Sequence, residues 1–554
     1  MKQNDNFTNY HKDFLDGRYD CVDRIVFNGY FQSGQQGGWF RNWWRDLTGS
    51  DETLDNEHLK QMAGSFSRRV HCWASENKIP LIHCAPGERK HQIAEKYLPS
   101  DPNYQGLFLI LVGKAPGLVW EVTHGSKGVP HLERKKPWPY INHYHFHIID
   151  REWGHIIIKM SGHPPFGVQI ILNGHEWVER KARKQTISCE VRKEGNCFVG
   201  GSFHAIDKIA DTLCQESASG LLAMVSDRWV YSSCLCFALN LEDQERTNFR
   251  YQYSCYQLEY SRNLLFTRGS ELDSVYQGLI ERSRCTLDVN KLKTIFGWKH
   301  RPHNLKRNGK PLPDPRIESI VDRSVYNLTV FKVHFSNLTL KIYDKGERVL
   351  RIEAVVHNIK DLRCGKSLEK LSIMLEKLQK MVIDFLNVVQ AVHVSFIDDG
   401  ALDYLSQPTQ MGGRRLAGVN IEKQRMRIVM ESVLALAANP NGFTILELTE
   451  QVCKRMGQQE AYSQRQTAYD LCKLRGNHLV ERVNRRRLYH LKTPGIRQMA
   501  ALLILREKVI KPVLAACGKA RGGRPPKTIH PLDIHYGNLQ QELRATFKTI
   551  GIAA

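Results

Sequence analysis

The chain has 554 residues, of which 42% are hydrophobic and 25% are charged. This composition is that of an ordinary globular protein and excludes a largely disordered chain, a collagen or a coiled coil. The length allows roughly three or four domains. Purely apolar runs such as 107–112 are far shorter than the ~20 residues of a membrane helix, and the first residues contain no apolar signal segment. We therefore expect a cytoplasmic protein with no membrane partner.

Charge is the most informative feature of the composition. Lysine and arginine together number 79, and aspartate and glutamate number 57, which gives a net charge of +22. Residues 421–530 contain 21 basic and 8 acidic residues, so 13 of the 22 excess charges lie there. An excess of this size suits a polyanion. We expect DNA as the partner, single-stranded as well as duplex, with RNA not excluded; the alternative is a solvated basic face.

Several chemistries are disfavoured by missing motifs. The 14 cysteines include no C-x-x-C pair, which argues against a zinc ribbon and for reduced, structural thiols. The sequence has no Gly-rich phosphate loop followed by Lys-Ser/Thr, no G-x-S-x-G and no H-E-x-x-H. We therefore expect no nucleotide cofactor, and neither serine hydrolase nor zinc protease chemistry.

The predicted elements of the first half alternate between strands and helices. A strand at 24–29 leads into an aromatic and basic loop that could stack on bases or form a local core. A helix follows at 56–75. Strands are predicted at 106–113 and 117–123, a hairpin at 143–149 and 155–160, helices at 173–183, 202–215 and 217–232, and an extended segment at 249–266. The residues of the aromatic loop are Trp39, Phe40, Arg41, Trp43, Trp44 and Arg45.

The hairpin carries three histidines, His143, His145 and His147, at period-two spacing. Two histidines around one hydrophobic residue resemble the metal pair of the HUH nickases, whose paired tyrosine nucleophiles have the spacing of Tyr256 and Tyr260. The segment around Tyr256 reads as extended, whereas that family carries its tyrosines on a helix. The alternative is a set of hydrogen-bonded histidines in a sheet.

After a helix at 271–284 the chain enters a Pro-rich basic connector at 299–315. Strands are then predicted at 327–334, 338–345 and 348–357, followed by an amphipathic helix at 367–390.

The last two of these strands carry the main candidate for chemistry. Tyr343-Asp344-Lys345 followed by Arg351-x-Glu353 resembles the Tyr-Asp-Lys … Arg-x-Glu signature of rolling-circle replication initiators and relaxases. The resemblance implies that Tyr343 attacks a DNA phosphodiester and remains attached to the 5′ phosphate. It also implies that Asp344, Glu353 and Glu259 hold Mg²⁺ or Mn²⁺, and that Lys345 or Arg351 holds phosphate.

The expected register of this hairpin works against that interpretation. With Gly346 and Glu347 as a two-residue turn, Asp344 shares a face with Arg351 and Glu353, and Tyr343 points to the other face. The sheet would then separate the nucleophile from the metal ligands unless a bulge re-aims it. The alternative is a structural hairpin whose charged residues form salt bridges.

The C-terminal region predicts a winged helix-turn-helix. Helices at 421–438, 444–455 and 463–476 are followed by strands at 479–483 and 488–491, a pattern that resembles the DNA-binding domain of MarR-like regulators. In the third helix Ala468, Leu471 and Cys472 would face the core. Arg465, Gln466, Tyr469 and Lys473 would read base edges in the major groove, and Arg485, Arg486 and Arg487 at the wing tip would contact backbone or minor groove. The alternative is a winged helix used for protein contacts.

The tail contains a second basic motif. Residues 520–527 resemble an AT-hook, in which Arg521 and Arg524 would enter a narrow minor groove. A second glycine interrupts the Arg-Gly-Arg-Pro core, so the alternative is a plain basic linker.

These observations predict a multidomain α/β protein with mixed, largely antiparallel sheets and a winged helix-turn-helix domain. We expect a replication-initiator or mobile-element protein that nicks DNA with a metal and a tyrosine. The alternative is a non-enzymatic DNA- or RNA-binding regulator or defence-associated binding protein, and a homo-oligomer is compatible with both. The expected domains are an N-terminal α/β region (1–100), a β-rich α/β domain (101–215), an α/β domain with the nickase hairpin (216–400), the winged helix (421–515) and a basic tail (516–554).

Overall fold

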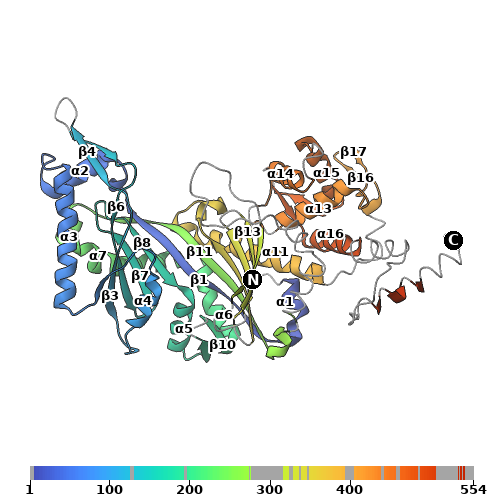
Figure 1. The fold of residues 1–554 in the computed structure, drawn as a ribbon, viewed down its shortest axis with the longest axis horizontal. Helices are drawn as coiled ribbons and strands as arrows, with labels where there is room; N and C mark the ends of the chain where they lie inside the picture. The colour runs from blue at the N-terminus through green and yellow to red at the C-terminus, as the bar shows by residue number, and fades with distance from the viewer. Residues whose placement is uncertain are drawn as a thin grey trace, which may run out of the picture. The chain divides into compact units, whose positions relative to one another are not determined.

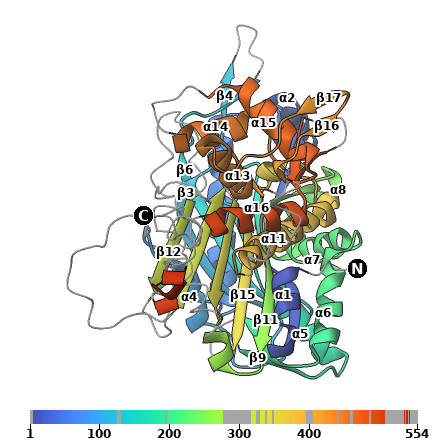
Figure 2. The same cartoon turned by 90° about the vertical axis from the view of Figure 1, so that its right-hand side faces the viewer.

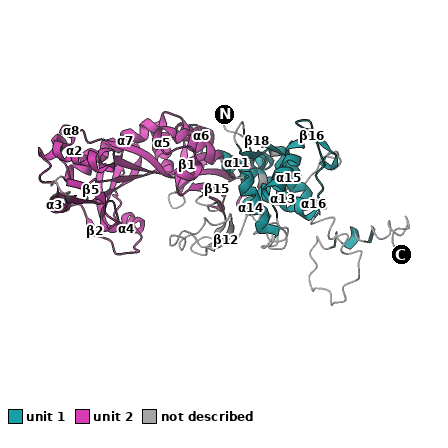
Figure 3. Cartoon of the chain, turned by 90° about the horizontal axis from the view of Figure 1, so that it is seen from above, with its two compact units in different colours: residues 1–14, 270–318, 380–554 teal, residues 15–269, 319–379 magenta. Residues whose placement is uncertain are grey.

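The computed structural model divides the chain into two compact units (Figure 3). Unit 2 consists of Leu15–Gly269 and Ser319–Gln379, and unit 1 of Met1–Phe14, Ser270–Glu318 and Lys380–Ala554. The residues that the structure describes are 5–124, 130–192, 196–273, 275, 316–322, 328–335, 338–345, 348–393, 405–437, 439, 442–456, 462–483, 487–506, 534–535, 537–539 and 541–542. The predicted connector at 299–315 lies outside this description. Of the helix predicted at 271–284, the structure describes residues 271–273 and 275.

One large, mostly antiparallel sheet organises unit 2 (Figure 1). The described residues give its strand order as β12-β13-β14-β15-β11-β1-β8-β7-β6-β3-β2, with only the short edge pair β2–β3 shown as parallel. The prediction of a mixed α/β fold with a largely antiparallel sheet is confirmed. The strands are β1 (Leu15–Phe31), β2 (Leu81–His83), β3 (Gly106–Pro116), β6 (Tyr140–Asp150), β7 (Gly154–Ser161), β8 (Val168–Asn173), β11 (Tyr251–Phe266), β12 (Arg316–Asp322), β13 (Leu328–Phe335), β14 (Leu338–Asp344) and β15 (Val349–Val356).

The two longest strands, β1 and β11, pair with each other in the middle of this sheet. Figure 2 shows β11 beside β15, its neighbour on the other side. Strands from the expected domains 1–100, 101–215 and 216–400 therefore lie in one sheet and do not form separate sheets. The predicted strand at 24–29 is only the second half of β1, because the first half contains Asp20 and Asp23, whose polar side chains hide the strand pattern.

The helices of unit 2 begin where local sequence signals place them. Asp55 caps α3 (Asn56–Glu76) by accepting a hydrogen bond from the His58 amide, and Asn173 caps α5 (Gly174–Lys184) in the same way. Phe66 of α3 packs on Tyr144 of β6 with ring centroids 5.0 Å apart, so α3 covers that face of the sheet. Further helices are α6 (Phe203–Asp211), α7 (Ala218–Ser233) and α11 (Leu371–His393), which corresponds to the helix predicted at 367–390 and whose residues divide between the two units.

The predicted aromatic loop is wrong. These residues form a helix, α2 (Gly37–Thr48), whose Phe40, Trp43 and Trp44 are buried. Arg41 and Arg45 both pair with Asp51, so they are engaged within the protein. The aromatic cluster is thus a local core, and only Trp39 remains substantially exposed.

The segment predicted as a strand at 117–123 forms β4 (Trp120–His124). It pairs with β5 (Pro130–Arg134) outside the large sheet. Two short strands that the sequence did not indicate, β9 (Cys189–Arg192) and β10 (Cys197–Gly201), form a further hairpin.

Unit 1 contains a set of helices followed by a small hairpin. Between residues 424 and 505 the elements are α13 (Gln424–Leu436), α14 (Ile445–Met456), α15 (Gln464–Gly476), β18 (Val480–Arg482), β19 (Tyr489–Leu491) and α16 (Thr493–Leu505). Ser463 and Gln466 form a reciprocal capping box at the start of α15. Among the described helices, none combines the length and the apolar character needed to cross a bilayer.

Candidate functional site

The register of the β14–β15 hairpin differs from the predicted register by one residue. Tyr343 lies opposite Arg351, and Asp344 lies opposite Leu350. The Lys345 amide donates to the Val349 carbonyl at 2.8 Å, so the loop holds three residues, 346–348, and not two. Because side chains alternate along a strand, this slip moves every side chain of β14 to the other face relative to β15. The predicted separation of Tyr343 from Glu353 is therefore wrong, and it is Asp344 that lies on the other face.

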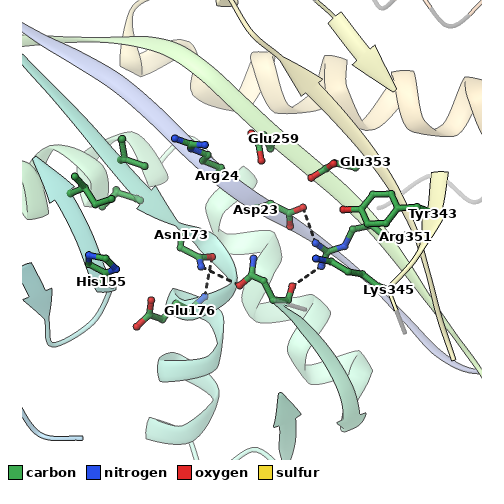
Figure 4. Close-up of a pocket in the computed structure, with 14 residues that line it drawn as sticks. Asp23, Arg24, His155, Asn173, Glu176, Glu259, Tyr343, Lys345, Arg351 and Glu353 are labelled. Atoms are coloured by element: carbon green, nitrogen blue, oxygen red, sulfur yellow. Dashed lines mark hydrogen bonds and ion pairs between the residues drawn. The ribbon is translucent and has the colours of Figure 1, made fainter. Parts of the chain in front are cut away.

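The face that carries Tyr343 opens into a cavity of about 340 Å³ (Figure 4). Of the predicted catalytic and metal-binding residues, it brings together Tyr343, Lys345, Arg351, Glu353 and Glu259. Asp344 does not line the cavity, which removes it from the predicted metal ligands. Sequence reasoning missed further polar lining residues, which are Asp23, Arg24, His155, Asn173, Glu176 and Asn196.

A β-bulge in β1 delivers two of these missed residues. Val22 pairs with Tyr260 and Arg24 pairs with Glu259, so Asp23 is an extra residue without an opposing partner on β11. An extra residue breaks the alternation of side chains, and Asp23 and Arg24 consequently both face the cavity. The signal in the sequence was two consecutive charged residues, Asp23 and Arg24, within an otherwise apolar stretch of β1.

Arg351 is buried and held by the protein at each of its nitrogen atoms. Nε donates to Asn263 at 2.7 Å, Nη1 lies 3.5 Å from Asp23, and Nη2 donates to the Asn196 carbonyl at 2.6 Å. Burial alone would raise the pKa of Asp23. The charge of Arg351 and the interaction of Asp23 with His175 outweigh burial and lower the pKa of Asp23 to about 2. With its donors occupied, Arg351 is a positioning residue, and the cations that remain at the cavity are Lys345 and Arg24.

The described residues contain one group of three metal-ligating side chains, Cys21, Asp23 and His175, whose donor atoms lie within 4.8 Å of one another. This group could hold a metal, and two of its members, Asp23 and His175, already lie within ion-pair distance of each other. The Phe198 amide donates to the Tyr19 hydroxyl at 2.9 Å, which leaves the hydroxyl proton for His175 Nε2, 3.3 Å away. His175 Nδ1 then carries the proton directed at Asp23, at 2.8 Å. A metal would have to displace this proton.

Two carboxylates, Glu259 and Glu353, lie on neighbouring strands and face the same cavity (Figure 4). Burial, and then the charge of Glu353, raises the pKa of Glu259 to about 7. Glu353 forms an ion pair with Lys341 at 2.7 Å. Burial and the Glu353 charge also raise the pKa of Tyr343, whereas burial beside Arg351 lowers the pKa of Lys345. Carboxylate oxygens are the ligands that a hard divalent cation such as Mg²⁺ or Mn²⁺ takes.

We expect Glu259→Gln to alter the pH dependence of stability. The Glu259 pKa is about 7 in the folded protein against an ordinary 4.5, so the folded state binds more protons between these values. The stability of the wild type should therefore fall as pH rises from about 4.5 to about 7, and glutamine removes this loss. Urea denaturation at pH 5 and pH 8 should show a larger advantage for the variant at pH 8. The exposed Glu52→Gln is the control, and a pH-independent difference for Glu259→Gln would contradict the raised pKa.

The histidines of β6 are not joined to the tyrosines of β11. His147 Nδ1 lies 3.0 Å from His155 Nε2, which agrees with histidines hydrogen-bonded within a sheet. Tyr260 is buried on the face opposite Glu259, and its hydroxyl donates to Asp20 at 2.8 Å. Tyr256 is 41% exposed. The described geometry therefore gives no site that combines this histidine row with Tyr260 as nucleophile.

In unit 1, Arg465 and Tyr469 are exposed on α15, and Arg487 is exposed after β18. Gln466 accepts a hydrogen bond from the Ser463 amide in the capping box. Lys473 lies beside Tyr469, with Nζ 4.6 Å from the ring centroid, but it is buried and its Nζ is also 3.8 Å from Asp470. Arg485, Arg486, Arg521 and Arg524 lie outside the described residues.

No family model, no curated protein and no solved structure matches this chain. Its function therefore has to be argued from the site itself.

Proposed function

We propose that unit 2 cleaves DNA by transesterification at the cavity beside Tyr343, as a replication-initiator or mobile-element protein would. The observation that carries this proposal is the register of β14 and β15. It places the Tyr343 hydroxyl group on the same sheet face as Glu353, Glu259 and Lys345, around one cavity.

In the proposed step, the Tyr343 oxygen attacks the phosphorus atom and the 3′ oxygen of the broken phosphodiester leaves. Glu353, whose charge acts directly on Tyr343, accepts the phenolic proton, and the leaving oxygen takes up a proton from solvent. The product is a 5′ phosphotyrosine and a free 3′ hydroxyl. Lys345, 5.8 Å from the Tyr343 ring centroid, lies where it can hold the phosphate. Mg²⁺ or Mn²⁺ held by Glu259 and Glu353 would polarise the phosphate.

We further propose that unit 1 locates the DNA through a winged helix-turn-helix. The order of α13, α14, α15 and the β18–β19 hairpin supports this proposal, as does the exposure of Arg465, Tyr469 and Arg487. The excess of 13 positive charges over residues 421–530 supports it as well.

The experiment that tests cleavage uses the full chain with supercoiled plasmid and with single-stranded DNA, in Mg²⁺ or Mn²⁺. A denaturing gel should show nicked strands and protein covalently joined to the 5′ end. Absence of cleavage and adduct on every substrate with both metals would overturn the enzymatic proposal.

The second candidate is a non-enzymatic DNA- or RNA-binding regulator. The observation that favours it is that Asp23–Arg351 and Lys341–Glu353 pair within the protein, as a structural core would also require. The absence of cleavage in the experiment above would select this candidate.

We expect substitutions in the two parts of the winged helix to act differently on duplex binding. Arg487→Ala at the wing should weaken binding similarly on all sequences and reduce the salt slope by about 0.9. Arg465→Ala on α15 should relax sequence preference by about 1–3 kcal/mol per lost base contact. Fluorescence anisotropy across a salt series on specific and random duplexes measures both effects. Equal loss on all sequences for Arg465→Ala would remove its base-reading role.

A further inference from the structure

A polar row crosses four strands of the large sheet beside the cavity. Asn28 of β1 lies opposite Gln169 of β8, Gln169 lies opposite Lys159 of β7, and Lys159 lies opposite His145 of β6. Directly opposed residues of antiparallel strands share a face. The Gln169 amide donates to the Asn28 side chain at 3.0 Å, which fixes one end of the row. All four side chains are partly accessible.

This row lies on the same face as the cavity. The next row toward the cavity contains Ile171, opposite Ile157, and both isoleucines line the cavity together with Arg24. The other face is covered by α3, whose Phe66 packs on Tyr144, the residue between His143 and His145. The cavity beside Tyr343 and the polar row therefore share one face of the sheet, with Ile157 and Ile171 between them.

A second lysine reaches the far end of the row. Gly113 of β3 lies opposite His143, and a Cβ atom at this glycine would meet Lys90 Cε at 3.1 Å and Nζ at 3.3 Å. The glycine thus leaves the room in which Lys90 lies over the strand. Lys90, Lys159, His143 and His145 together form what we call the basic patch, built from α4 (Lys90–Lys96), β6 and β7.

Burial and the positive charges of its lysines lower pKa values in the basic patch. Burial, then Lys159, then Lys90 lower the pKa of His145 to about 3, and burial and the same lysines lower that of His143 to about 4. Burial, followed by the charge of Lys90, lowers the pKa of Lys159 as well. The neighbouring lysines disfavour the positive forms of His143, His145 and Lys159, and a bound anion would relieve this repulsion.

We propose that the basic patch and the polar row bind the phosphate backbone of single-stranded DNA and lead the strand into the cavity beside Tyr343. This inference rests on the proposed function, because it names the form of DNA that the same site receives. Lys90 and Lys159 hold phosphates. Gln169 and Asn28 offer hydrogen bonds to base edges, and Ile157 and Ile171 offer apolar contact. Base edges and faces are accessible in this way only in an unpaired strand.

The test measures binding without any requirement for cleavage. Full-length protein in EDTA is titrated against a fluorescent single-stranded oligonucleotide and against a duplex of the same sequence. Lys90→Ala/Lys159→Ala should weaken single-strand binding about tenfold and lower its salt slope by about 1.4, at about 0.7 per phosphate contact. Duplex binding, which we assign to unit 1, should not change. The control Lys60→Ala/Arg68→Ala removes two exposed charges from α3 on the opposite face and should leave both affinities unchanged.

Removal of two mutually repelling lysines should not impair folding, and a thermal melt checks this directly. Lys159→Gln, which keeps the length and polarity of the side chain, should show half of the salt-slope change. An unchanged affinity and slope in Lys90→Ala/Lys159→Ala would overturn the inference, and so would equal loss on duplex and single strand. These outcomes are independent of cleavage, because binding is measured in EDTA, without the divalent metal that the proposed cleavage requires.

Discussion

Tyr343→Phe should abolish formation of the covalent DNA adduct, with a loss of at least about 10³-fold in strand cleavage. The phenol oxygen is the only atom removed, so the aromatic ring keeps its packing and its contact with Lys345. The hydrogen bond between Tyr343 and Arg351 is also lost, which costs about 1 kcal/mol and leaves the protein folded. Cleavage is measured on a denaturing gel, and the adduct is measured by protease-sensitive retention of labelled 5′ ends.

Tyr256→Phe is the matched control, because this tyrosine lies on β11, is 41% exposed and is not among the residues that line the cavity. It should cleave as the wild type does. Glu353→Gln keeps the nucleophile but removes the proton acceptor and one carboxylate, so it should reduce cleavage and weaken its dependence on metal concentration. An adduct that persists in Tyr343→Phe would assign the nucleophile to another residue.

Arg351→Met should lower the free energy of unfolding by about 3–5 kcal/mol. The guanidinium group is 2% exposed, and its loss leaves Asp23 as an uncompensated buried charge and Asn263 without its donor. Methionine fills similar volume, so the loss comes from the unpaired polar groups and not from a cavity. Urea denaturation at pH 7 measures the effect.

Arg348→Met is the comparison for this prediction. Arg348 precedes β15 and pairs with Asp16 at 3.0 Å, but about 40% of each side chain is exposed. An exposed pair of this kind contributes at most about 1 kcal/mol, so this variant should remain close to wild type. If the two substitutions cost the same, the Arg351 network does not stabilise the sheet. Asp23→Asn combined with Arg351→Met should recover part of the loss, because it removes the stranded charge.

Local sequence signals determined the elements that depend on neighbouring residues alone. The helix predicted at 56–75 is observed as α3 at Asn56–Glu76, because Asp55 caps it and apolar residues recur with helical spacing. The β6–β7 hairpin follows from alternating hydrophobic residues around a polar turn. Ser463 marks the start of α15 for the same local reason. Such signals act within a few residues, so they can be read without knowledge of the fold.

The tertiary structure alone decided which side chains meet. A turn of two or three residues after Lys345 suits the local sequence equally, and the folded sheet has the longer one, which places Tyr343 opposite Arg351 and Lys341 opposite Glu353. Burial of Lys473 against Asp470 also depends on how α15 packs. Asp23 enters the cavity through a bulge that exists only because β1 pairs with β11. Register, bulges and burial depend on partners far away in the sequence, and a single residue of slip reverses which face a side chain occupies.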